Sequence, residues 1–494
     1  MSLIKVTNLT FAYEGSYDNI FDQVSFQIDT DWKLGFTGRN GRGKTTFLNL
    51  LLGNYEYNGT ISADVSFEYF PFPIKNKENN TLDIIDHICP DYQHWELLRE
   101  LSLLKVSEDV LYRPFDTLSN GEQTKVQLAA LFLKENSFLL IDEPTNHLDI
   151  HARKLVSDYL KAKSGFILVS HDRAFLDNCV DHILTINKAG IEIQKGSFSD
   201  WWENKQRQDH FEMAENEKLR KDVKRLNEAA KRTSSWSHEV EKTKNGTRNS
   251  GSKVDKGYIG HKAAKMMKRS KSLEHRQQSA IDERSQLLKN VESSDSLKIS
   301  QLAYHKSQLI ELDHVLIQYG EKPVCRDVSF TIEQGDRIAL SGPNGSGKSS
   351  ILKLIYGEEI PFSGTFRKGS QLKISYVSQD TAHLRGHLSA YAESHGIDES
   401  LFKAILRKLD FSRIQFEKDI ASFSGGQKKK VLIAKSLCEP AHLHIWDEPL
   451  NFIDVISRMQ IEELLLEHAP TILFVEHDSE FCKHVATKVV ELKG

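Results

Sequence analysis

The chain has few of the residues on which small secreted domains and membrane proteins depend. Its 494 residues include five cysteines, Cys89, Cys179, Cys325, Cys438 and Cys482, and no two of them form a CxxC pair. This scatter excludes a disulfide framework and a cysteine zinc site, and it predicts reduced thiols in a cytoplasmic protein. No apolar run approaches the roughly 18 residues that span a bilayer, so the sequence predicts no membrane segment.

Proline is missing from residues 201–305, and glycine occurs there only between Gly246 and Gly260. Apolar residues recur at helical spacing before the glycines, at Leu219, Val223, Leu226 and Ala230, and after them, at Met266, Leu273, Ala280 and Leu287. This spacing predicts two amphipathic helices paired as an antiparallel hairpin. Some 30 to 35 residues in each helix would reach about 50 Å, with the glycines at the tip.

The phosphate-binding signature GxxxxGK[ST] occurs twice, at residues 38–45 and 342–349. Each copy follows an apolar run typical of a strand, Lys33 to Thr37 or Arg337 to Ser341, and precedes an apolar run typical of a helix. In this setting backbone N–H groups surround phosphate, the lysine adds a positive charge, and the Thr or Ser hydroxyl can ligate Mg²⁺. The expected ATP-binding residues are Gly38, Asn40, Gly41, Gly43, Lys44, Thr45 and Thr46, and Gly342, Asn344, Gly345, Gly347, Lys348, Ser349 and Ser350.

Downstream of each loop, an apolar run ends in an acidic pair, Asp142-Glu143 or Asp447-Glu448. The carboxyl ends of parallel strands form the edge of a sheet at which ligands bind. We therefore expect both aspartates to support Mg²⁺ and both glutamates to polarise the attacking water.

Another apolar run ends in a histidine, His171 in the first half and His477 in the second. A histidine there can contact the γ-phosphate and the water, although a histidine at the end of a strand is more often a structural hydrogen-bonding group. The two loop lysines are 304 positions apart, the two glutamates 305 and the two histidines 306. This constant register predicts two complete ATP-handling modules in tandem.

A Ser-Gly turn lies between each loop and its acidic pair, as Leu118-Ser119-Asn120-Gly121-Glu122-Gln123 and Phe423-Ser424-Gly425-Gly426-Gln427. This LSGGQ-like sequence between both nucleotide motifs resembles the ATP-binding cassette (ABC) superfamily. The resemblance implies two cassettes that close head to tail, each ATP lying between the glycine loop of one and the Ser-Gly turn of the other. It adds Ser119, Gly121, Ser424 and Gly426 to the expected ATP-binding residues.

Further residues follow from the resemblance. Tyr13 and Tyr319 stand where ABC proteins stack a ring on adenine, although a core tyrosine at a strand end is an alternative. Tyr376-Val377-Ser378-Gln379 carries the family's glutamine, which the resemblance places at ATP and metal, whereas Tyr69-Phe70-Pro71-Phe72 does not. With Asn120 in place of glycine, this departure indicates that the two sites differ. The expected metal ligands are Thr45, Asp142, Ser349, Gln379 and Asp447.

Positive charge is concentrated at the expected tip of the hairpin. Residues 231–276 include thirteen basic and four acidic residues, a net charge of +9, whereas the whole chain carries −4. One basic segment on an acidic protein predicts a polyanionic target such as nucleic acid, although a solvated spacer between cassettes is the alternative.

Two cassettes joined by a long basic linker resemble the ABC-F proteins, which act on the ribosome. Within them, four stretches look like the Lsa-type antibiotic-resistance members: Trp32-Lys33-Leu34-Gly35, Leu111-Tyr112-Arg113-Pro114-Phe115, 445–451 and Lys268-Arg269-Ser270-Lys271. The resemblance implies an α/β fold with domains at 1–200 and 306–494, joined by a helical hairpin at 201–305. It also implies a cytoplasmic, ribosome-associated, monomeric ATPase with ATP and Mg²⁺ as cofactors.

The Lsa-type members protect the 50S subunit from lincosamides, streptogramin A and pleuromutilins. The resemblance implies binding to the 70S ribosome at the tRNA exit site, with the tip meeting 23S rRNA and P-site tRNA. The tip residues expected nearest to RNA are Lys244, Lys253, Val254, Lys256 and Tyr258. A housekeeping ABC-F translation factor would share every ATP motif and remains an alternative, and the ATPase subunit of an exporter is a more distant one.

Overall fold

The computed structural model describes residues 2–13, 19–146, 148–187, 190–243, 302–320, 322–343 and 345–492. The chain divides into two units. One unit comprises Met1–Trp201 and Ser296–Gly494 and holds both cassettes, and the other comprises Trp202–Asp295.

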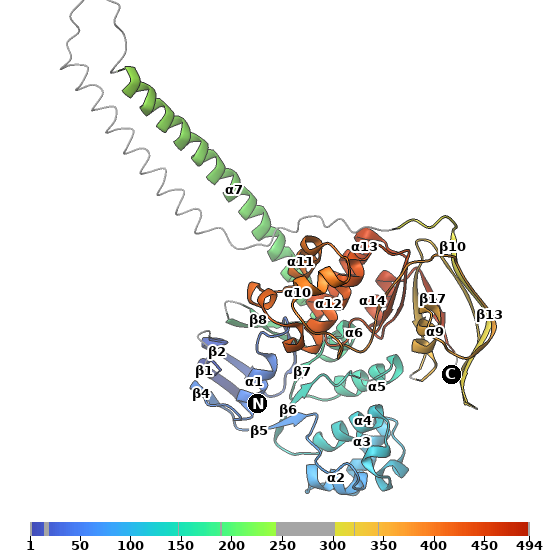
Figure 1. The fold of residues 1–494 in the computed structure, drawn as a ribbon. Coiled ribbons are helices and arrows are strands. Elements are labelled where there is room, and N and C mark those ends of the chain that lie inside the picture. Colours follow the sequence, from blue (N-terminus) through green and yellow to red (C-terminus); the bar gives the residue numbers. More distant parts are fainter. Residues whose placement is uncertain are drawn as a thin grey trace, which may run out of the picture. The chain divides into compact units, whose positions relative to one another are not determined.

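The first cassette is built on two β-sheets (Figure 1). A three-stranded antiparallel sheet has the order β2-β1-β4, and a six-stranded sheet has the order β5-β6-β7-β3-β8-β9. The strands are β1 (Leu3–Phe11), β2 (Phe21–Asp29), β3 (Lys33–Thr37), β4 (Asn58–Ser62), β5 (Ser66–Phe70), β6 (Ser137–Asp142), β7 (Phe166–Val169), β8 (His182–Asn187) and β9 (Gly190–Lys195). Strands β5 to β8 with β3 pair in parallel, so their carboxyl ends share one edge.

In the part of this cassette that the structure describes, six α-helices accompany the sheets. They are α1 (Lys44–Leu51), α2 (Thr81–Ile88), α3 (His94–Leu103), α4 (Asn120–Leu131), α5 (Ile150–Lys161) and α6 (Arg173–Cys179). Figure 1 shows α2, α3 and α4 as a helical group of their own, in which α4 contacts the other two. Strand β7 is fully buried, which explains its uninterrupted apolar sequence Phe-Ile-Leu-Val.

The second cassette repeats this plan with sheets of order β11-β10-β13 and β14-β15-β16-β12-β17, the latter entirely parallel. Its strands are β10 (Gln308–Tyr319), β11 (Lys322–Glu333), β12 (Arg337–Ser341), β13 (Phe362–Lys368), β14 (Ile374–Val377), β15 (Leu443–Asp447), β16 (Ile472–Val475) and β17 (Lys488–Glu491). Its helices are α9 (Lys348–Tyr356), α10 (Leu388–Ser394), α11 (Glu399–Lys408), α12 (Gly425–Cys438), α13 (Val455–His468) and α14 (Ser479–Val485). The tandem α/β fold predicted from the sequence is confirmed.

The linker begins with one helix, α7 (Phe198–Thr243). Its 46 residues correspond to about 69 Å, so the expected length of 30 to 35 residues was too short. The sequence has neither glycine nor proline between Phe198 and Thr243, so nothing in it ends the helix earlier. The expected second helix of the hairpin lies outside the described residues.

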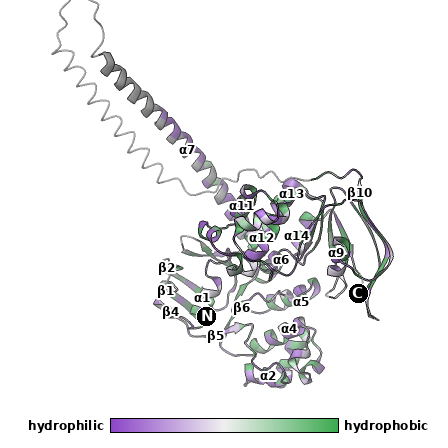
Figure 2. Ribbon diagram, viewed as in Figure 1, coloured by the Kyte–Doolittle hydropathy of each residue, from purple (hydrophilic) through white to green (hydrophobic). Residues whose placement is uncertain are grey.

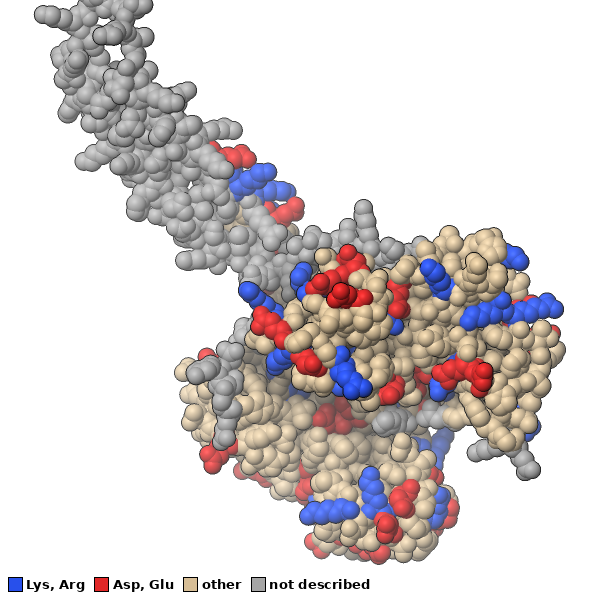
Figure 3. All heavy atoms as spheres, viewed as in Figure 1, with Lys and Arg blue, Asp and Glu red and all other residues tan. Residues whose placement is uncertain are grey.

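The surface of α7 is charged where its side chains are described. Arg207 pairs with Glu203 at 3.1 Å and Lys221 with Glu217 at 3.4 Å, each four residues apart. Figure 2 colours this part as hydrophilic, and Figure 3 shows basic and acidic side chains next to each other on it. Ion pairs at this spacing support an exposed helix by a few tenths of a kcal/mol each, roughly 0.2–0.5 kcal/mol. Among the described residues, no helix is long and apolar enough to cross a membrane.

Candidate nucleotide-binding sites

Both glycine loops connect a central strand to a helix whose first residue is the motif lysine. In the first cassette the loop between β3 and α1 has φ angles of 148° at Gly38, 80° at Gly41 and 94° at Gly43. These values favour glycine, and a Cβ at Gly43 would lie 2.6 Å from Ile20 Cγ2. The loop therefore presents backbone N–H groups at a helix N-terminus, which is a ready binding site for phosphate.

The lysine side chains fold back over their loops. Lys44 Nζ donates to Gly38 O at 2.6 Å and to Asn40 Oδ1 at 3.3 Å. Burial lowers the pKa of Lys44, and nearby carboxylates, with Asp454 first among them, oppose that shift. A buried ammonium held only by neutral oxygens is well placed to gain from an anionic phosphate.

The second loop, between β12 and α9, has the same geometry. Gly342, Gly345 and Gly347 have φ angles of 148°, 83° and 87°. Lys348 Nζ donates to Gly342 O and Pro343 O, both at 2.9 Å. Asn344 lies outside the described residues.

The acidic pairs lie at the carboxyl ends of β6 and β15, beside the hydroxyl group that follows each lysine. Thr45 Oγ1 donates to Asp142 Oδ2 at 3.4 Å, and Ser349 Oγ donates to Asp447 Oδ1 at 3.2 Å. A hydroxyl and a carboxylate oxygen are the hard ligands that Mg²⁺ prefers, so these residues fit that ion. When bound, Mg²⁺ would neutralise phosphate charge there.

The two glutamates share an unusual backbone and differ in their surroundings. Glu143 has φ 51° and Glu448 has φ 47°, a region that non-glycine residues rarely occupy and that is often retained at functional sites. Burial, with the neighbouring charge of Asp142, raises the pKa of Glu143 to about 8. Burial alone would raise the pKa of Glu448 as well, but the His477 ring and the Asn451 amide hold it below its ordinary value.

Each histidine lies beside its glutamate. His171 Nε2 is 3.2 Å from Glu143 Oε1, and His477 Nε2 is 3.7 Å from Glu448 Oε1. Burial and the charge of Lys44 lower the pKa of His171 well below its ordinary value, which favours a neutral ring. A glutamate and a neutral imidazole side by side can orient a water molecule for attack on phosphorus and accept its proton.

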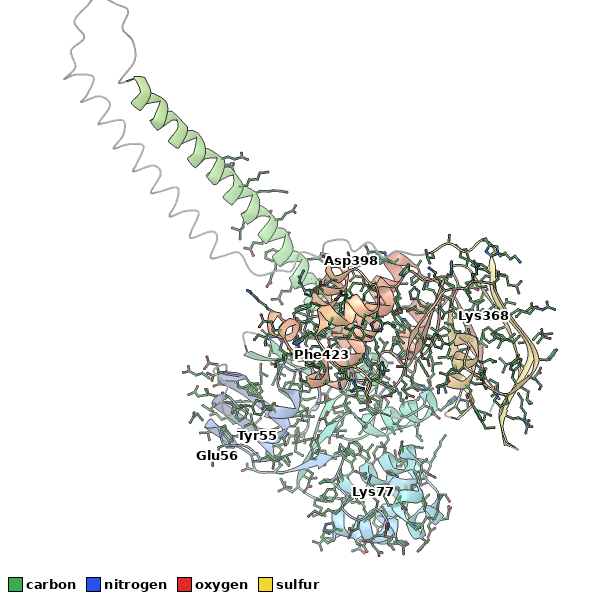
Figure 4. The ribbon with its side chains drawn as sticks, viewed as in Figure 1. Tyr55, Glu56, Lys77, Lys368, Asp398 and Phe423 are labelled. Carbon is green, nitrogen blue, oxygen red and sulfur yellow. The ribbon has the colours of Figure 1, made fainter. Side chains whose placement is uncertain are left out.

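Tyrosines approach the start of both α1 and α9. Tyr13 OH lies 2.7 Å from Thr46 Oγ1, and Tyr319 OH donates to Ser350 Oγ at 3.3 Å. Both rings are exposed, and Tyr55, labelled in Figure 4, packs edge-on against Tyr13 with ring centroids 5.8 Å apart. An exposed ring next to the phosphate-binding loop can stack on a base.

Both Ser-Gly turns cap a helix. Ser119 Oγ accepts from the backbone N–H of Glu122, and Ser424 Oγ accepts from that of Gln427. The side chains of Glu122 and Gln427 accept in return from the serine N–H groups, which completes a capping box at α4 and at α12. Phe423, labelled in Figure 4, anchors the second turn in a buried core.

The turn of the second cassette lies at the glycine loop of the first. Asn40 Nδ2 donates to Phe452 O at 2.7 Å, and a Cβ added at Gly426 would lie 3.0 Å from Asn40 Nδ2. Arg39 Nη1 pairs with Asp410 Oδ1 at 2.7 Å. The structure therefore brings Gly426 next to Asn40, and only a residue without a side chain leaves room for this approach.

A second set of contacts joins the histidine loops. Arg153 Nη1 donates to Asp172 Oδ2 at 3.0 Å and to His477 O of the other cassette at 3.3 Å. Arg173 Nη2 donates to Glu462 Oε2 of the other cassette at 2.6 Å. The second site also has a neighbour from the first cassette. Burial lowers the pKa of Lys348, and Asp149 of the first cassette is one of the carboxylates close enough to oppose that shift.

Sequence reasoning missed a tyrosine at each acidic pair. Tyr69 OH donates to Asp142 Oδ2 at 2.9 Å, and Tyr376 and Asp447 interact in the same way. Burial, followed by these aspartates, raises the pKa of both tyrosines. The sequence does contain a signal for them, because a tyrosine opens both equivalent four-residue segments, 69–72 and 376–379.

We predict that Tyr69→Phe with Tyr376→Phe raises the Mg²⁺ concentration for half-maximal ATP hydrolysis by about tenfold, since the phenol groups orient the aspartates that we expect to support Mg²⁺. A Mg²⁺ titration of phosphate release measures this effect. Tyr92→Phe is a matched control, because Tyr92 also donates to an aspartate, Asp86, but in the helical group. Equal Mg²⁺ dependence in all three proteins would contradict the assignment.

The expected tip residues Lys244, Lys253, Val254, Lys256 and Tyr258 lie outside the described residues. Gln379 is described, and its amide Nε2 donates to Glu448 Oε2 at 2.9 Å.

Comparison with known proteins agrees with this geometry. The family described as ABC transporter matches residues 21–146 and 325–451. The chain is 28% identical to the ribosome protection protein VmlR of Bacillus subtilis over 97% of this chain and 84% of the relative. It is 26% identical to the ATP-binding protein Uup of Buchnera aphidicola over 99% of this chain and 80% of the relative. It is 25% identical to the energy-dependent translational throttle protein EttA of Escherichia coli over 96% of this chain and 89% of the relative.

Among solved structures, a complex of the archaeal ribosomal stalk protein aP1 with the archaeal ribosome recycling factor aABCE1 aligns with a TM-score of 0.64. It covers 99% of this chain and 87% of that chain at 19% sequence identity, which supports the tandem-cassette fold. The structure contains two phosphate loops, each with its acidic pair and its histidine. The family match covers both of these modules and so agrees with the structure. The chain therefore belongs to the ABC transporter family of ATP-hydrolysing domains, and it is an ABC-F family ATPase.

Proposed function

We propose that this ATPase binds the ribosome and protects the 50S subunit from lincosamide, streptogramin A and pleuromutilin antibiotics. In the proposed cycle the ATP-bound protein occupies the tRNA exit site as a monomer in the cytoplasm. Its linker tip then meets 23S rRNA and P-site tRNA and dislodges the drug, and hydrolysis releases the protein. Similarity to the ribosome protection protein VmlR over 97% of the chain supports this proposal.

The observation that carries the ribosomal part is the charge and length of the linker. Helix α7 has 46 residues, and its last part belongs to residues 231–276, whose net charge is +9. A segment with this net positive charge suits a phosphate backbone as its partner. We assign the closest contacts to Lys244, Lys253, Val254, Lys256 and Tyr258.

This assignment predicts a salt effect. Replacing Lys244, Lys253 and Lys256 by alanine should weaken ribosome binding and reduce the slope of log K against log salt by about three, one for each lost phosphate contact. Binding measured between low and physiological salt gives the slope. Arg207→Ala, which removes a basic residue on α7 that pairs with Glu203, is the matched control. An unchanged slope in the triple variant would contradict the assignment.

A second candidate is a housekeeping translation factor, favoured by comparable similarity to the translational throttle protein EttA. Expression in a susceptible bacterium separates the two. The protection role predicts raised inhibitory concentrations for the three drug classes, unchanged inhibition by a drug that acts on the small subunit, and loss of protection in a Glu143→Gln, Glu448→Gln variant. Unchanged susceptibility to all drugs would contradict protection and favour the housekeeping role.

A further inference from the structure

We propose that the two ATP sites turn over unequally: the site built on the second cassette hydrolyses ATP, and the site built on the first retains it. The difference arises because, among the described residues, side-chain amides hold the second glutamate in place and none holds the first. This inference rests on ATP hydrolysis alone and is independent of the proposed ribosomal role.

In the second cassette the carboxylate of Glu448 is fixed on one side. Gln379 Nε2 donates to Glu448 Oε2 at 2.9 Å, and Asn451 Nδ2 donates to the same oxygen at 2.6 Å. The other oxygen, Oε1, lies 3.7 Å from His477 Nε2. Two donors on Oε2 therefore leave Oε1 to accept a proton from water beside the histidine.

In the first cassette a phenylalanine stands in the place of Gln379. Tyr69 pairs with Leu140 in the parallel sheet, and Tyr376 pairs with Ile445. Leu140 and Ile445 each lie two residues before the metal-binding aspartate, so the two tyrosines are equivalent. Phe72 lies three residues after Tyr69, and Gln379 lies three residues after Tyr376, so the two occupy equivalent positions.

Phe72 has no side-chain donor, so it cannot supply the hydrogen bond that the Gln379 amide gives to Glu448. Its backbone N–H donates to Gln127 Oε1 at 2.9 Å, and its ring packs edge-on against His87 with centroids 6.1 Å apart. Asn146, the counterpart of Asn451, bonds to Glu143 through its backbone N–H and the glutamate's carbonyl oxygen at 3.3 Å. In the described part of the chain, the buried Glu143 Oε1 has no hydrogen-bond partner, although His171 Nε2 lies 3.2 Å away.

The phosphate-binding lysines and the backbones of the two glutamates are alike, so we place the difference on hydrolysis. Both lysines fold onto a loop carbonyl, and both glutamates have the same backbone conformation. The asparagine at position 120 does not reverse this assignment, because Ser119 forms the same capping box as Ser424. A Cβ at the equivalent Gly425 would make only ordinary contact with the Phe452 ring, at 3.7 Å. A general base held in one orientation reacts faster than one that is not held.

The test exchanges the two side chains. Phe72→Gln supplies the missing amide and should raise hydrolysis at the first site by about tenfold, and Gln379→Phe should lower it at the second site by about tenfold. Both changes should appear in kcat, and in Phe72→Gln the KM for ATP should stay within about twofold of the unaltered value, because Phe72 is not among the expected ATP- or metal-binding residues. Phe72→Leu removes the ring without adding a donor and is the matched control, with unchanged kcat.

Photolabelling with 8-azido-ATP assigns the nucleotide to each site. After one turnover time, peptides of the first cassette should carry ATP and those of the second ADP. In Phe72→Gln both should carry ADP. Equal ADP at both sites of the unaltered protein would overturn the inference, as would a Phe72→Gln protein that still retains ATP at the first site. Because this readout needs no ribosome, its failure is distinct from failure of the proposed function.

Discussion

A Glu143→Gln, Glu448→Gln double variant is expected to hydrolyse ATP about a thousandfold more slowly than the unaltered protein and still to bind it. General-base groups contribute roughly 10²–10⁴-fold to such reactions. Glutamine keeps the shape of the side chain and lacks the carboxylate that accepts the proton of water. The lysines, hydroxyl groups and aspartates that would hold phosphate and Mg²⁺ are unchanged, so binding energy persists.

Two measurements check this expectation. Phosphate release gives the rate of hydrolysis, and the nucleotide that remains with the protein after gel filtration gives retention. Glu56→Gln removes an exposed carboxylate outside the sites, labelled in Figure 4, and should change neither quantity. A double variant that retains hydrolysis within tenfold of the unaltered protein would show that these glutamates do not act as the bases.

Gly426→Ala is expected to have the second largest effect, because the two cassettes meet at this glycine. An added Cβ would clash with Phe452 O and lie 3.0 Å from Asn40 Nδ2, and these two groups form one of the hydrogen bonds between the cassettes. Overpacking at a tight contact costs about 1–3 kcal/mol, and about 1.4 kcal/mol corresponds to tenfold in rate. We therefore expect ATP turnover to fall by at least about tenfold, with closure of the cassettes impaired.

The neighbouring glycine is the control. At Gly425 the nearest atoms to an added Cβ belong to the Phe452 ring, at 3.7 Å, which is ordinary contact. Gly425→Ala should therefore keep turnover within about twofold, since little has to move. Thermal unfolding of both variants shows whether the fold is intact. If Gly426→Ala turned over ATP as fast as Gly425→Ala at equal stability, the contact would have no role in closure.

Local chemistry made the nucleotide sites predictable from the sequence. The expected strands Lys33–Thr37 and Arg337–Ser341 coincide with β3 and β12, because an apolar run before a glycine loop has few alternatives. The tandem register predicted the second cassette from the first, and both the fold and ATP hydrolysis are confirmed.

Contacts that depend on distant segments were not predictable in this way. Tyr69 reaches Asp142 only because β5 pairs with β6, and no local pattern assigns that partner. Arg39 and Asp410 lie 371 positions apart and meet only where the two cassettes touch. The predicted length of α7 was too short because the apolar repeat from Leu219 to Ala230 covers only part of the helix. The sequence has no glycine or proline that would end the helix before Thr243.

Sedimentation of ribosomes with the Glu143→Gln, Glu448→Gln protein in ATP and in ADP is the most direct test. The protein should pellet with ribosomes in ATP and stay in the supernatant in ADP. The triple tip variant at Lys244, Lys253 and Lys256 should pellet less than the Arg207→Ala control. Equal amounts in the pellet with ATP, ADP and no nucleotide would contradict a ribosome-binding function driven by closure of the two cassettes.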